Sequence, residues 1–284
     1  MLELSGGEGR WRLGHGGDTL NTAIHLARAG VPTAYLTALG TDPFSAQLRA
    51  AWAGEGLDTS LVLTHPTRGA GLYAITTDPA GERSFTYWRG DSAARALFDC
   101  PGIDEACAFA RDADLLAFSL ISLAILPDEG RGKLLALAAA VRAAGGRVAF
   151  DGNYRPQLWA SPDEAGFWRN RAIAVADIGL PTLEDETMLG APADPQAVRQ
   201  HWQGLGCSET VVKLGAGGCL LPDGTIVSPA AVLQPVDTSG AGDAFNAGYL
   251  AARLRGKAPD EAARAGHALA GWTIMRPGAV PARD

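Results

Sequence analysis

The sequence of 284 residues contains no apolar run that approaches the roughly 18 residues needed for a membrane-spanning helix. Its first residues also lack the basic segment followed by an apolar core that defines a secretory signal peptide. We therefore expect a soluble, unsecreted, cytoplasmic protein without a membrane partner.

Cysteine and positive charge are both scarce. The four cysteines (Cys100, Cys107, Cys207 and Cys219) lie far apart without a C-x-x-C pair, so we expect reduced thiols and no zinc site. Lys and Arg number 24 against 31 Asp and Glu, and the net charge of −7 argues against a nucleic-acid partner. A small anionic substrate is still compatible, because a few local arginines outweigh a diffuse charge.

Strands and helices alternate along most of the chain. Apolar runs predict strands at 34–39, 115–119, 147–151, 174–180, 209–213 and 219–222, with helices at about 18–29, 41–54, 131–144, 183–189 and 260–275. There is no internal repeat or low-complexity linker. The alternation predicts a single α/β domain over 1–284, with a doubly wound, mostly parallel sheet flanked by helices.

Two short regions interrupt this alternation. Residues 1–5 have the pattern of the tail of a strand, and a glycine-rich loop is predicted at 6–9. Residues 72–77 and 83–88 are β-rich runs on either side of D-P-A-G-E at 78–82, which is a hairpin signal.

The most informative stretch is D-T-S-G-A-G-D at 237–243, followed by an apolar helical pattern in which Phe245, Leu250 and Leu254 share one face. Glycine lets the backbone approach a ligand, and the first N–H groups of a helix suit an anion such as a transferring phosphoryl group. Asp243 is placed to take a proton from an attacking hydroxyl. The alternative is an ordinary Asp at the start of a core helix.

Three other stretches follow predicted strands, at 151–155, 182–186 and 213–218. Ligands of open parallel sheets gather at the carboxyl ends of the strands, so we expect these stretches near one site. Each also has a simpler interpretation: a surface salt bridge for Arg155, a solvated helix start for 184–186 and a plain hairpin turn for 215–218.

The predicted hairpin places side chains that could bind a ligand on one face of a strand. Side chains alternate along a strand, so Phe85, Tyr87 and Arg89 share a face, and a loop over 78–82 sets Tyr73 opposite Tyr87. Phenols hydrogen-bond carbonyls and hydroxyls, and a guanidinium binds a carboxylate through two parallel bonds. The alternative is a cross-strand aromatic pair beside an exposed arginine.

Nearly the whole chain resembles the ribokinase-like (PfkB) carbohydrate kinases. The resemblance is carried by G-G-D-T-L-N-T-A at 16–23, G-L-Y at 71–73, G-E-R-S-F-T-Y-W-R at 81–89, I-S-L-A-I-L at 121–126, F-D-G-N-Y-R-P-Q-L-W at 150–159 and the stretch at 237–243. The first and last of these are typical of the superfamily. The Tyr-Trp-Arg and Asn-Tyr-Arg-Pro stretches are similar to those of its members that act on 2-keto-3-deoxy sugar acids.

The resemblance implies ATP-dependent phosphorylation of the terminal hydroxyl of 2-keto-3-deoxygluconate, with Asp243 as the base. It implies sugar hydroxyl contacts from Gly16, Gly17 and Asn21, keto-acid contacts from Tyr73, Tyr87, Arg89 and Arg155, an anion hole from Gly240, Ala241 and Gly242, and ATP contacts from Asn153, Lys213, Gly215, Ala216 and Gly217. It also implies a lid from about 1–15 and 69–92 that pairs with the lid of a second copy.

The chain departs from the family pattern in its magnesium motif, usually Asn-x-x-Glu. Thr182 replaces the Asn, and Asp185 stands at the Glu position beside Glu186, so either carboxylate is a candidate for Mg²⁺ and its waters. A monovalent cation is a further cofactor compatible with the family. The family also begins with an apolar strand, and we expect the natural protein to start about ten residues upstream of Met1, because strands usually span about five or six residues.

Two alternatives to the keto-acid kinase stay open. One is a kinase of a neutral sugar such as fructose or ribose, which shares Asp243 but gives Arg89 no charge to bind. The other is a non-catalytic sugar-acid sensor on the same fold, which has no need of a base. The sequence does not separate the gluconate from the galactonate epimer.

Overall fold

The computed structural model describes residues 1–7, 9–77 and 83–283. It divides into two compact units, Met1–Ala106 and Cys107–Asp284, with the boundary inside helix α3 (Ile103–Arg111). The predicted hairpin turn at 78–82 lies outside the described residues. None of the helices in these ranges combines the length and apolar character that a membrane crossing requires.

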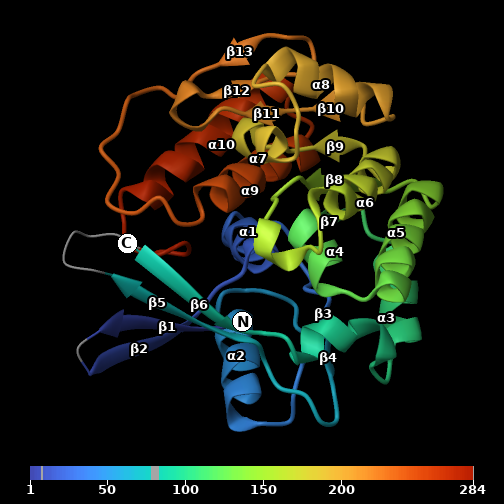
Figure 1. The fold of residues 1–284 in the computed structure, drawn as a ribbon, viewed down its shortest axis with the longest axis vertical. Coiled ribbons are helices and arrows are strands. Elements are labelled where there is room, and N and C mark those ends of the chain that lie inside the picture. Colours follow the sequence, from blue (N-terminus) through green and yellow to red (C-terminus); the bar gives the residue numbers. More distant parts are fainter. Residues whose placement is uncertain (8, 78–82, 284) are drawn as a thin grey trace. The chain divides into compact units, whose positions relative to one another are not determined.

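The first unit is built on a four-stranded sheet in the order β2-β1-β5-β6 (Figure 1). Its strands are β1 (Leu2–Gly7), β2 (Arg10–His15), β5 (Leu72–Thr77) and β6 (Arg83–Trp88). β5 and β6 are antiparallel and pair Tyr73 with Tyr87, which confirms the register predicted for the hairpin. The four strands come from the two segments from which the lid is expected.

The remaining elements of this unit are two helices, a two-stranded sheet and a 3₁₀ segment: α1 (Asp18–Arg28), α2 (Pro43–Gly54), β3 (Thr37–Leu39), β4 (Val62–Thr64) and η1 (Ala93–Asp99). Helix α2 begins as predicted, because the Asp42 side chain accepts a hydrogen bond from the Ser45 N–H at 3.0 Å and Pro43 occupies the first turn.

Two predictions for this unit were wrong. Gly6 and Gly7 belong to β1 and not to a loop, and β2 was not predicted. Its signal was present, since Trp11, Leu13 and His15 alternate with Arg10, Arg12 and Gly14, but three glycines just before it favoured a loop. The strand predicted at 34–39 begins only at Thr37, with an isolated bridge at Ala34.

The second unit contains a parallel sheet in the order β10-β9-β8-β7, as predicted for its strands. The strands are β7 (Leu115–Ser119), β8 (Arg147–Asp151), β9 (Ile178–Gly179) and β10 (Glu209–Thr210). A three-stranded antiparallel sheet follows, with β11 (Val212–Lys213), β12 (Cys219–Leu220) and β13 (Ile226–Val227). β8 is buried throughout Val148, Ala149 and Phe150, as expected of a strand covered on both faces.

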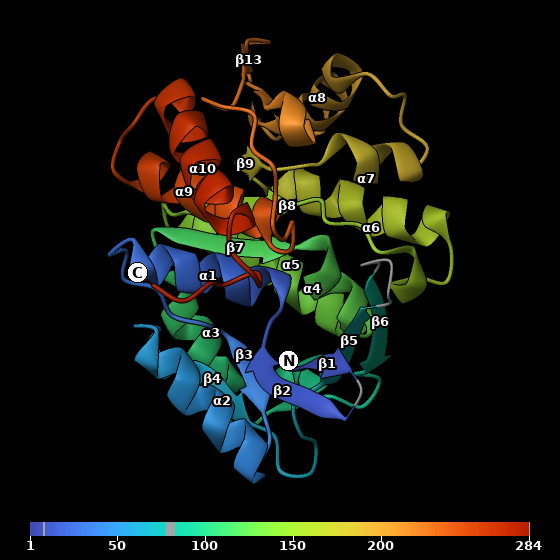
Figure 2. The same ribbon diagram turned by 90° about the vertical axis from the view of Figure 1, so that its left-hand side faces the viewer.

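The helices of this unit are α4 (Leu120–Ile125), α5 (Asp128–Ala143), α6 (Pro162–Val175), α7 (Leu183–Met188), α8 (Pro195–Gly204), α9 (Ala241–Leu254) and α10 (Pro259–Ile274). The 3₁₀ segments are η2 (Pro156–Leu158) and η3 (Gly215–Gly217). Figure 2 shows α9 and α10 side by side, as does Figure 1.

The strand predicted at 174–180 was wrong over its first half. Ser161 caps α6 by accepting a hydrogen bond from the Glu164 N–H at 3.1 Å, and the helix continues through Ala174 and Val175 before the short strand β9. A short apolar run does not distinguish a buried helix end from a strand. Helices α4, α6 and α8 were not predicted.

At the centre of this core, three aromatic rings pack against one another, and one of them also packs against two glycines. The rings of Phe118 and Phe150 lie 5.2 Å apart, and those of Phe150 and Trp202 lie 5.5 Å apart. A Cβ on Gly179 would lie 2.5 Å from the Trp202 ring, and one on Gly152 would lie 3.1 Å from it. The glycines at the ends of β8 and β9 therefore make room for the indole of α8.

Helices α9 and α10 also approach through glycines. A Cβ on Gly248 would lie 2.6 Å from the Ala265 carbonyl oxygen, and one on Gly266 would lie 2.8 Å from the Phe245 ring. Phe245 and Leu250 are buried as predicted, whereas Leu254 is 39% exposed at the end of the helix. Close packing without side chains at these positions fixes the distance between the two helices.

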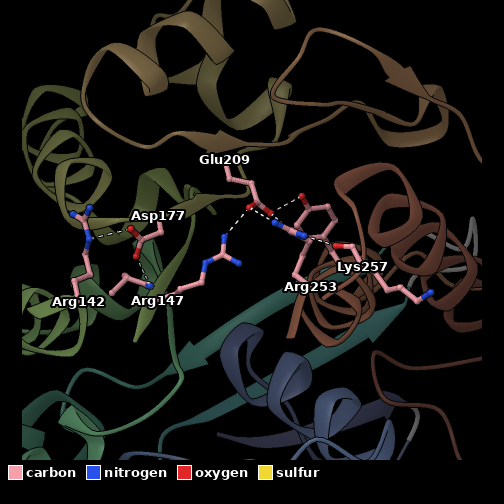
Figure 3. A network of polar contacts seen from close by, with 8 residues as sticks. Arg142, Arg147, Asp177, Glu209, Arg253 and Lys257 are labelled. Carbon is pink, nitrogen blue, oxygen red and sulfur yellow. Dashed lines mark hydrogen bonds and ion pairs between the residues drawn. The ribbon is translucent and has the colours of Figure 1, made fainter. Parts of the chain in front are cut away.

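The C-terminal half of α9 is tied to the sheet by Glu209 of β10, shown with its neighbours in Figure 3. The Glu209 carboxylate accepts two hydrogen bonds from Arg253 at 2.7 and 2.9 Å, one from Tyr249 at 2.8 Å and one from Arg147 at 2.6 Å. Burial raises the pKa of Glu209, but the hydrogen bonds from Arg253, Tyr249 and Arg147 outweigh it and hold the pKa below its usual value. The carboxylate thus links β8, β10 and α9.

The contact between α9 and α10 predicts unequal effects of two glycine-to-alanine changes in helices. Gly248→Ala should lower the free energy of unfolding by about 1–3 kcal/mol, because the added methyl meets backbone. Gly132→Ala in α5 meets no atom within 4 Å and should raise it by about 0.5–1 kcal/mol through helix propensity alone. Urea unfolding of both variants measures this, and equal effects would contradict the packing argument.

Candidate active site

A buried lysine organises the carboxyl end of the parallel sheet. The Lys213 ammonium, at the end of β11, donates to Asp151 Oδ1 at 3.0 Å and to Asn246 Oδ1 at 3.2 Å. Asn246 Nδ2 in turn donates to Asp151 Oδ2 at 2.9 Å, which closes a triangle. Lys213 and Asn246 are 7% and 3% exposed, so the lysine charge is neutralised inside the protein by the carboxylate at the end of β8.

The glycine turn before α9 is held in place by residues far along the chain. Asp237 accepts hydrogen bonds from the Ser239 N–H at 2.9 Å and the Gly278 N–H at 2.7 Å. Gly240 caps α9 with φ 69° and ψ 8°, and a Cβ there would lie 2.6 Å from Cβ of Ala279. Both the left-handed backbone and the close approach require glycine at this position.

Asp243 lies in the first turn of α9 and is 9% exposed. A Cβ on Gly242 would lie 3.8 Å from Lys213 Nζ, so the ammonium lies beside the same turn. The positive end of the helix and the lysine charge therefore adjoin a carboxylate. Phosphoryl transfer to a hydroxyl needs this combination of a base and a site for negative charge.

Asp185 in the first turn of α7 is the second acidic group of the site. Arg155 Nη1 lies 3.3 Å from its Oδ1 and also donates to the Tyr154 carbonyl at 2.6 Å. Burial raises the pKa of Asp185 to about 6; Arg155 and Lys213 oppose that rise, and the nearby Asp151 adds to it. Asp185 is thus a buried carboxylate close to Lys213, Asp151 and Arg155.

Glu186 faces a different environment from its neighbour Asp185. It is fully buried, and its Oε2 accepts a hydrogen bond from Arg169 of α6 at 2.7 Å. Burial raises the pKa of Glu186, while Arg169 and the neighbouring Trp202 oppose the rise. Its negative charge is neutralised by an ion pair in the interior, between α6 and α7. The burial of this carboxylate therefore has a structural explanation.

Among the described residues, no group of three or more His, Cys, Asp or Glu side chains could hold a metal ion by itself. Mg²⁺ usually keeps several waters and takes only one or two carboxylates from a protein. Asp185 is the carboxylate beside the site that is compatible with such a role.

The other predicted ATP residues lie on two loops. Asn153 follows β8 two residues after Asp151, and Gly215, Ala216 and Gly217 form η3 between the antiparallel strands β11 and β12. The residues of η3 are exposed. The glycine loop is therefore a hairpin turn, and it directly follows Lys213.

The predicted aromatic face of the first unit is present. The ring of Tyr87 lies 6.0 Å from that of Tyr73 and 6.3 Å from that of Phe85, with which it is stacked. The guanidinium carbon of Arg89 lies 4.2 Å from the Tyr87 ring centroid. Tyr87 is 37% exposed and Tyr73 7%. Two phenols and a guanidinium thus share one face of the sheet, as the alternation predicted.

The glycines at 16 and 17 lie next to this face. A Cβ on Gly16 would lie 2.1 Å from the Tyr73 hydroxyl oxygen, so a side chain there would require the Tyr73 ring to move. Gly17 caps α1 with φ 150°, and its carbonyl accepts from the Asn21 N–H at 2.8 Å. Asn21 itself is 5% exposed.

The predicted residues therefore fall into two sets. One set lies in the first unit and comprises Gly16, Gly17, Asn21, Tyr73, Tyr87 and Arg89. The other lies in the second unit, where Lys213 is close to Gly242 and Asp185 to Arg155.

Sequence reasoning missed three residues that shape these sets. Asn246 lies three residues after Asp243, a spacing that puts both on one helix face, but a lone asparagine in a helix carries little signal. Asp237 was quoted only as the first residue of the motif, and its contact with Gly278 has no trace in the sequence. Glu3 accepts a hydrogen bond from the Tyr73 hydroxyl, which required β1 to be placed beside β5.

Comparison with known proteins identifies the family. Residues 3–283 match the pfkB family carbohydrate kinase. A protein of Escherichia coli (strain K12) named 2-dehydro-3-deoxygluconokinase is 42% identical over 294 aligned positions, covering 100% of this chain and 95% of that protein.

Solved structures agree with this assignment. A PfkB protein from Polaromonas sp. JS666 is 29% identical with a TM-score of 0.86, covering 99% of this chain and 94% of that one. Aminoimidazole riboside kinase from Salmonella enterica, in complex with aminoimidazole riboside and an ATP analog, is 26% identical with a TM-score of 0.83, covering 99% and 93%. The chain has the ribokinase-like fold and belongs to the pfkB family of carbohydrate kinases.

Proposed function

We propose that this kinase transfers the terminal phosphoryl group of ATP to the terminal hydroxyl of 2-keto-3-deoxygluconate. The observation that supports this substrate is the stacking of Arg89 on Tyr87, beside Tyr73. The guanidinium of Arg89 beside the Tyr87 phenol suits a carboxylate and a keto oxygen, whereas a neutral sugar offers it no charge. The 42% identity to a 2-dehydro-3-deoxygluconokinase supports the same substrate.

In this proposal Asp243 is the catalytic base. Its carboxylate takes the proton of the substrate hydroxyl as the oxygen attacks the terminal phosphorus atom of ATP. One P–O bond forms to the sugar and one breaks to the leaving ADP. A carboxylate in the first turn of α9 suits this role, because it lies beside the positive end of the helix. Lys213 is held next to the same turn by its ion pair with Asp151.

Negative charge on the transferred group is stabilised by the start of α9. Gly240, Ala241 and Gly242 form the proposed anion hole, and Lys213 adds its charge beside Gly242. Asp151 and Asn246 orient the ammonium. Asn153 and the loop of Gly215, Ala216 and Gly217 are proposed to lie by ATP; the relative solved with an ATP analog supports a nucleotide on this fold.

Asp185 is the proposed protein contact of hydrated Mg²⁺, which supplies charge neutralisation for the phosphates when bound. Glu186 is the weaker candidate, since its carboxylate is buried against Arg169. A monovalent cation is the other cofactor that this proposal includes, and replacing potassium by a bulky organic cation in the assay tests that requirement.

The sugar acid is proposed to contact Tyr73, Tyr87, Arg89 and Arg155, with Gly16, Gly17 and Asn21 at its hydroxyls. A kinase of fructose or ribose is the competing function, and a non-catalytic sensor is disfavoured by the intact base. A coupled assay across 2-keto-3-deoxygluconate, its galacto epimer, fructose and ribose separates these alternatives. Turnover of a neutral sugar alone would reject the proposal.

Asp243→Asn should lower kcat by about 10²- to 10⁴-fold, the usual contribution of a positioned base. Binding of ATP, measured by calorimetry, should stay within about twofold, because the amide keeps the shape of the carboxylate. Asp223→Asn removes an exposed carboxylate elsewhere in the unit and serves as the matched control with unchanged kcat. An Asp243→Asn enzyme within about threefold of the native rate would rule out this base.

Arg89→Ala should raise KM for the keto acid by about 10- to 150-fold, corresponding to the loss of about 1.5–3 kcal/mol from a charge-assisted hydrogen bond. KM for ATP should change by less than about twofold. Arg68→Ala, which removes a half-exposed arginine paired with Asp91 in the same unit, is the control. An unchanged keto-acid KM in Arg89→Ala would show that the aromatic face does not bind the substrate.

The four-stranded sheet is also proposed to be a lid that joins two copies of the chain. Trp11, Leu13 and Trp88 lie by register on the face opposite Tyr73 and are 49%, 40% and 57% exposed. Exposed apolar clusters of this kind mark interaction sites. Sedimentation should therefore report a dimer, and Trp11→Glu with Trp88→Glu should give a monomer. A native protein that sediments as a monomer at high concentration would contradict the lid pairing.

A further inference from the structure

Glu3 and Tyr73 form a hydrogen-bonded pair on the aromatic face of the first unit. They are direct neighbours in the parallel pairing of β1 and β5, and the Tyr73 hydroxyl donates to Glu3 Oε2. The next strand places Tyr87 opposite Tyr73 on the other side. One row across the sheet therefore reads Glu3, Tyr73, Tyr87, with Arg89 stacked on the last ring.

Gly16 makes room for this pair, and Gly14 packs beside it. Gly14 is paired with Glu3 in the register of β1 and β2. A Cβ there would lie 3.8 Å from Glu3 Oε1, and a Cβ on Gly16 would lie 3.3 Å from Glu3 Oε2 and 2.1 Å from the Tyr73 oxygen. The carboxylate and the phenol thus occupy space that any side chain at residue 16 would fill. The pair is a fixed part of the sheet, with Tyr73 only 7% exposed.

The pair decides what Tyr73 offers to a ligand. A phenol carries one proton, and a carboxylate only accepts hydrogen bonds. Because the Tyr73 proton is directed to Glu3, the Tyr73 oxygen presents lone pairs to anything else that it meets. A carbonyl or carboxylate oxygen of a ligand would find no donor there and would be repelled by the neighbouring Glu3 charge.

We propose that Glu3 is a positioning residue that makes Tyr73 a hydrogen-bond acceptor, so that Tyr73 recognises a hydroxyl of the sugar acid. The keto and carboxylate oxygens of the substrate then lie toward Tyr87 and Arg89, where donors are present. This assignment rests on the proposed function for the identity of the sugar. It divides the two phenols of the aromatic face into one acceptor and one donor, and so fixes the direction in which the substrate binds.

Three variants test the assignment through KM for the sugar of the assay panel that the enzyme phosphorylates. Glu3→Leu removes the acceptor for the phenol proton, Tyr73→Phe removes the hydroxyl, and Glu3→Gln keeps an acceptor at the same place. We expect Glu3→Leu and Tyr73→Phe each to raise the sugar KM by about 5- to 30-fold, the range for one hydrogen bond to a neutral or charged partner. Glu3→Gln should stay within about threefold, and KM for ATP should not change in any variant.

The double variant Glu3→Leu with Tyr73→Phe supplies the sharper readout. If Glu3 acts through Tyr73, the double variant is no worse than either single variant, because the second change removes a group that no longer functions. If the two changes multiply in their effects on the sugar KM, the proposal is wrong. It is also wrong if Glu3→Gln raises the sugar KM as much as Glu3→Leu does. Glu3→Leu with Arg89→Ala is the control pair, for which independent, multiplying effects are expected.

A measurement without substrate separates this inference from the proposed function. The chain has five tyrosines, so labelling their ring carbon next to oxygen gives a simple NMR spectrum. The resonance that disappears in Tyr73→Phe should shift in Glu3→Leu and stay nearly in place in Glu3→Gln. If this resonance does not shift in Glu3→Leu, the hydrogen bond between Glu3 and Tyr73 is not present. A shifted resonance in an enzyme that phosphorylates no sugar acid would reject the proposed substrate and with it the substrate half of the inference, while the pair would stand.

Discussion

The second unit depends on one buried positive charge. Lys213 is almost fully buried, and a buried charge is stable only when it is paired and hydrogen-bonded. Asp151 supplies the opposite charge and Asn246 completes the coordination, so three elements that are distant in sequence must meet at one point. The end of β8, the end of β11 and the second turn of α9 are therefore positioned together, and the same contacts place the glycine turn before α9.

Packing fixes the rest of α9 in a consistent way. Glycines at 248 and 266 set its distance from α10, and Glu209 ties its far half to the sheet through Arg253 and Tyr249. A helix held at both ends and along one side has little freedom to tilt. Asp243 in its first turn is thus held by the core of the unit and not by a mobile loop, and the proposed role as a base calls for this pre-organisation.

The sequence predicted most of this architecture where a pattern was local. Strand alternation placed Tyr73 opposite Tyr87, and the glycine-rich stretch before α9 predicted the turn at Gly240. It failed where tertiary context decides: α6 continued into an apolar run that resembled a strand, and β2 formed directly after a run of glycines. Glu3 could not be found at all, because a glutamate in a strand gains meaning only from the neighbour that another strand brings.

The anchoring of Asp237 to Gly278 has a consequence for synthesis on the ribosome. The turn that caps α9 is complete only when the backbone N–H of Gly278 reaches the Asp237 carboxylate and Ala279 lies against Gly240. A nascent chain that has not yet emerged beyond these residues can form β7, β8 and the helices around them, but it cannot close the turn. The turn that begins α9 therefore closes late, after the sheet beside it, because its partner Gly278 lies 41 residues beyond Asp237.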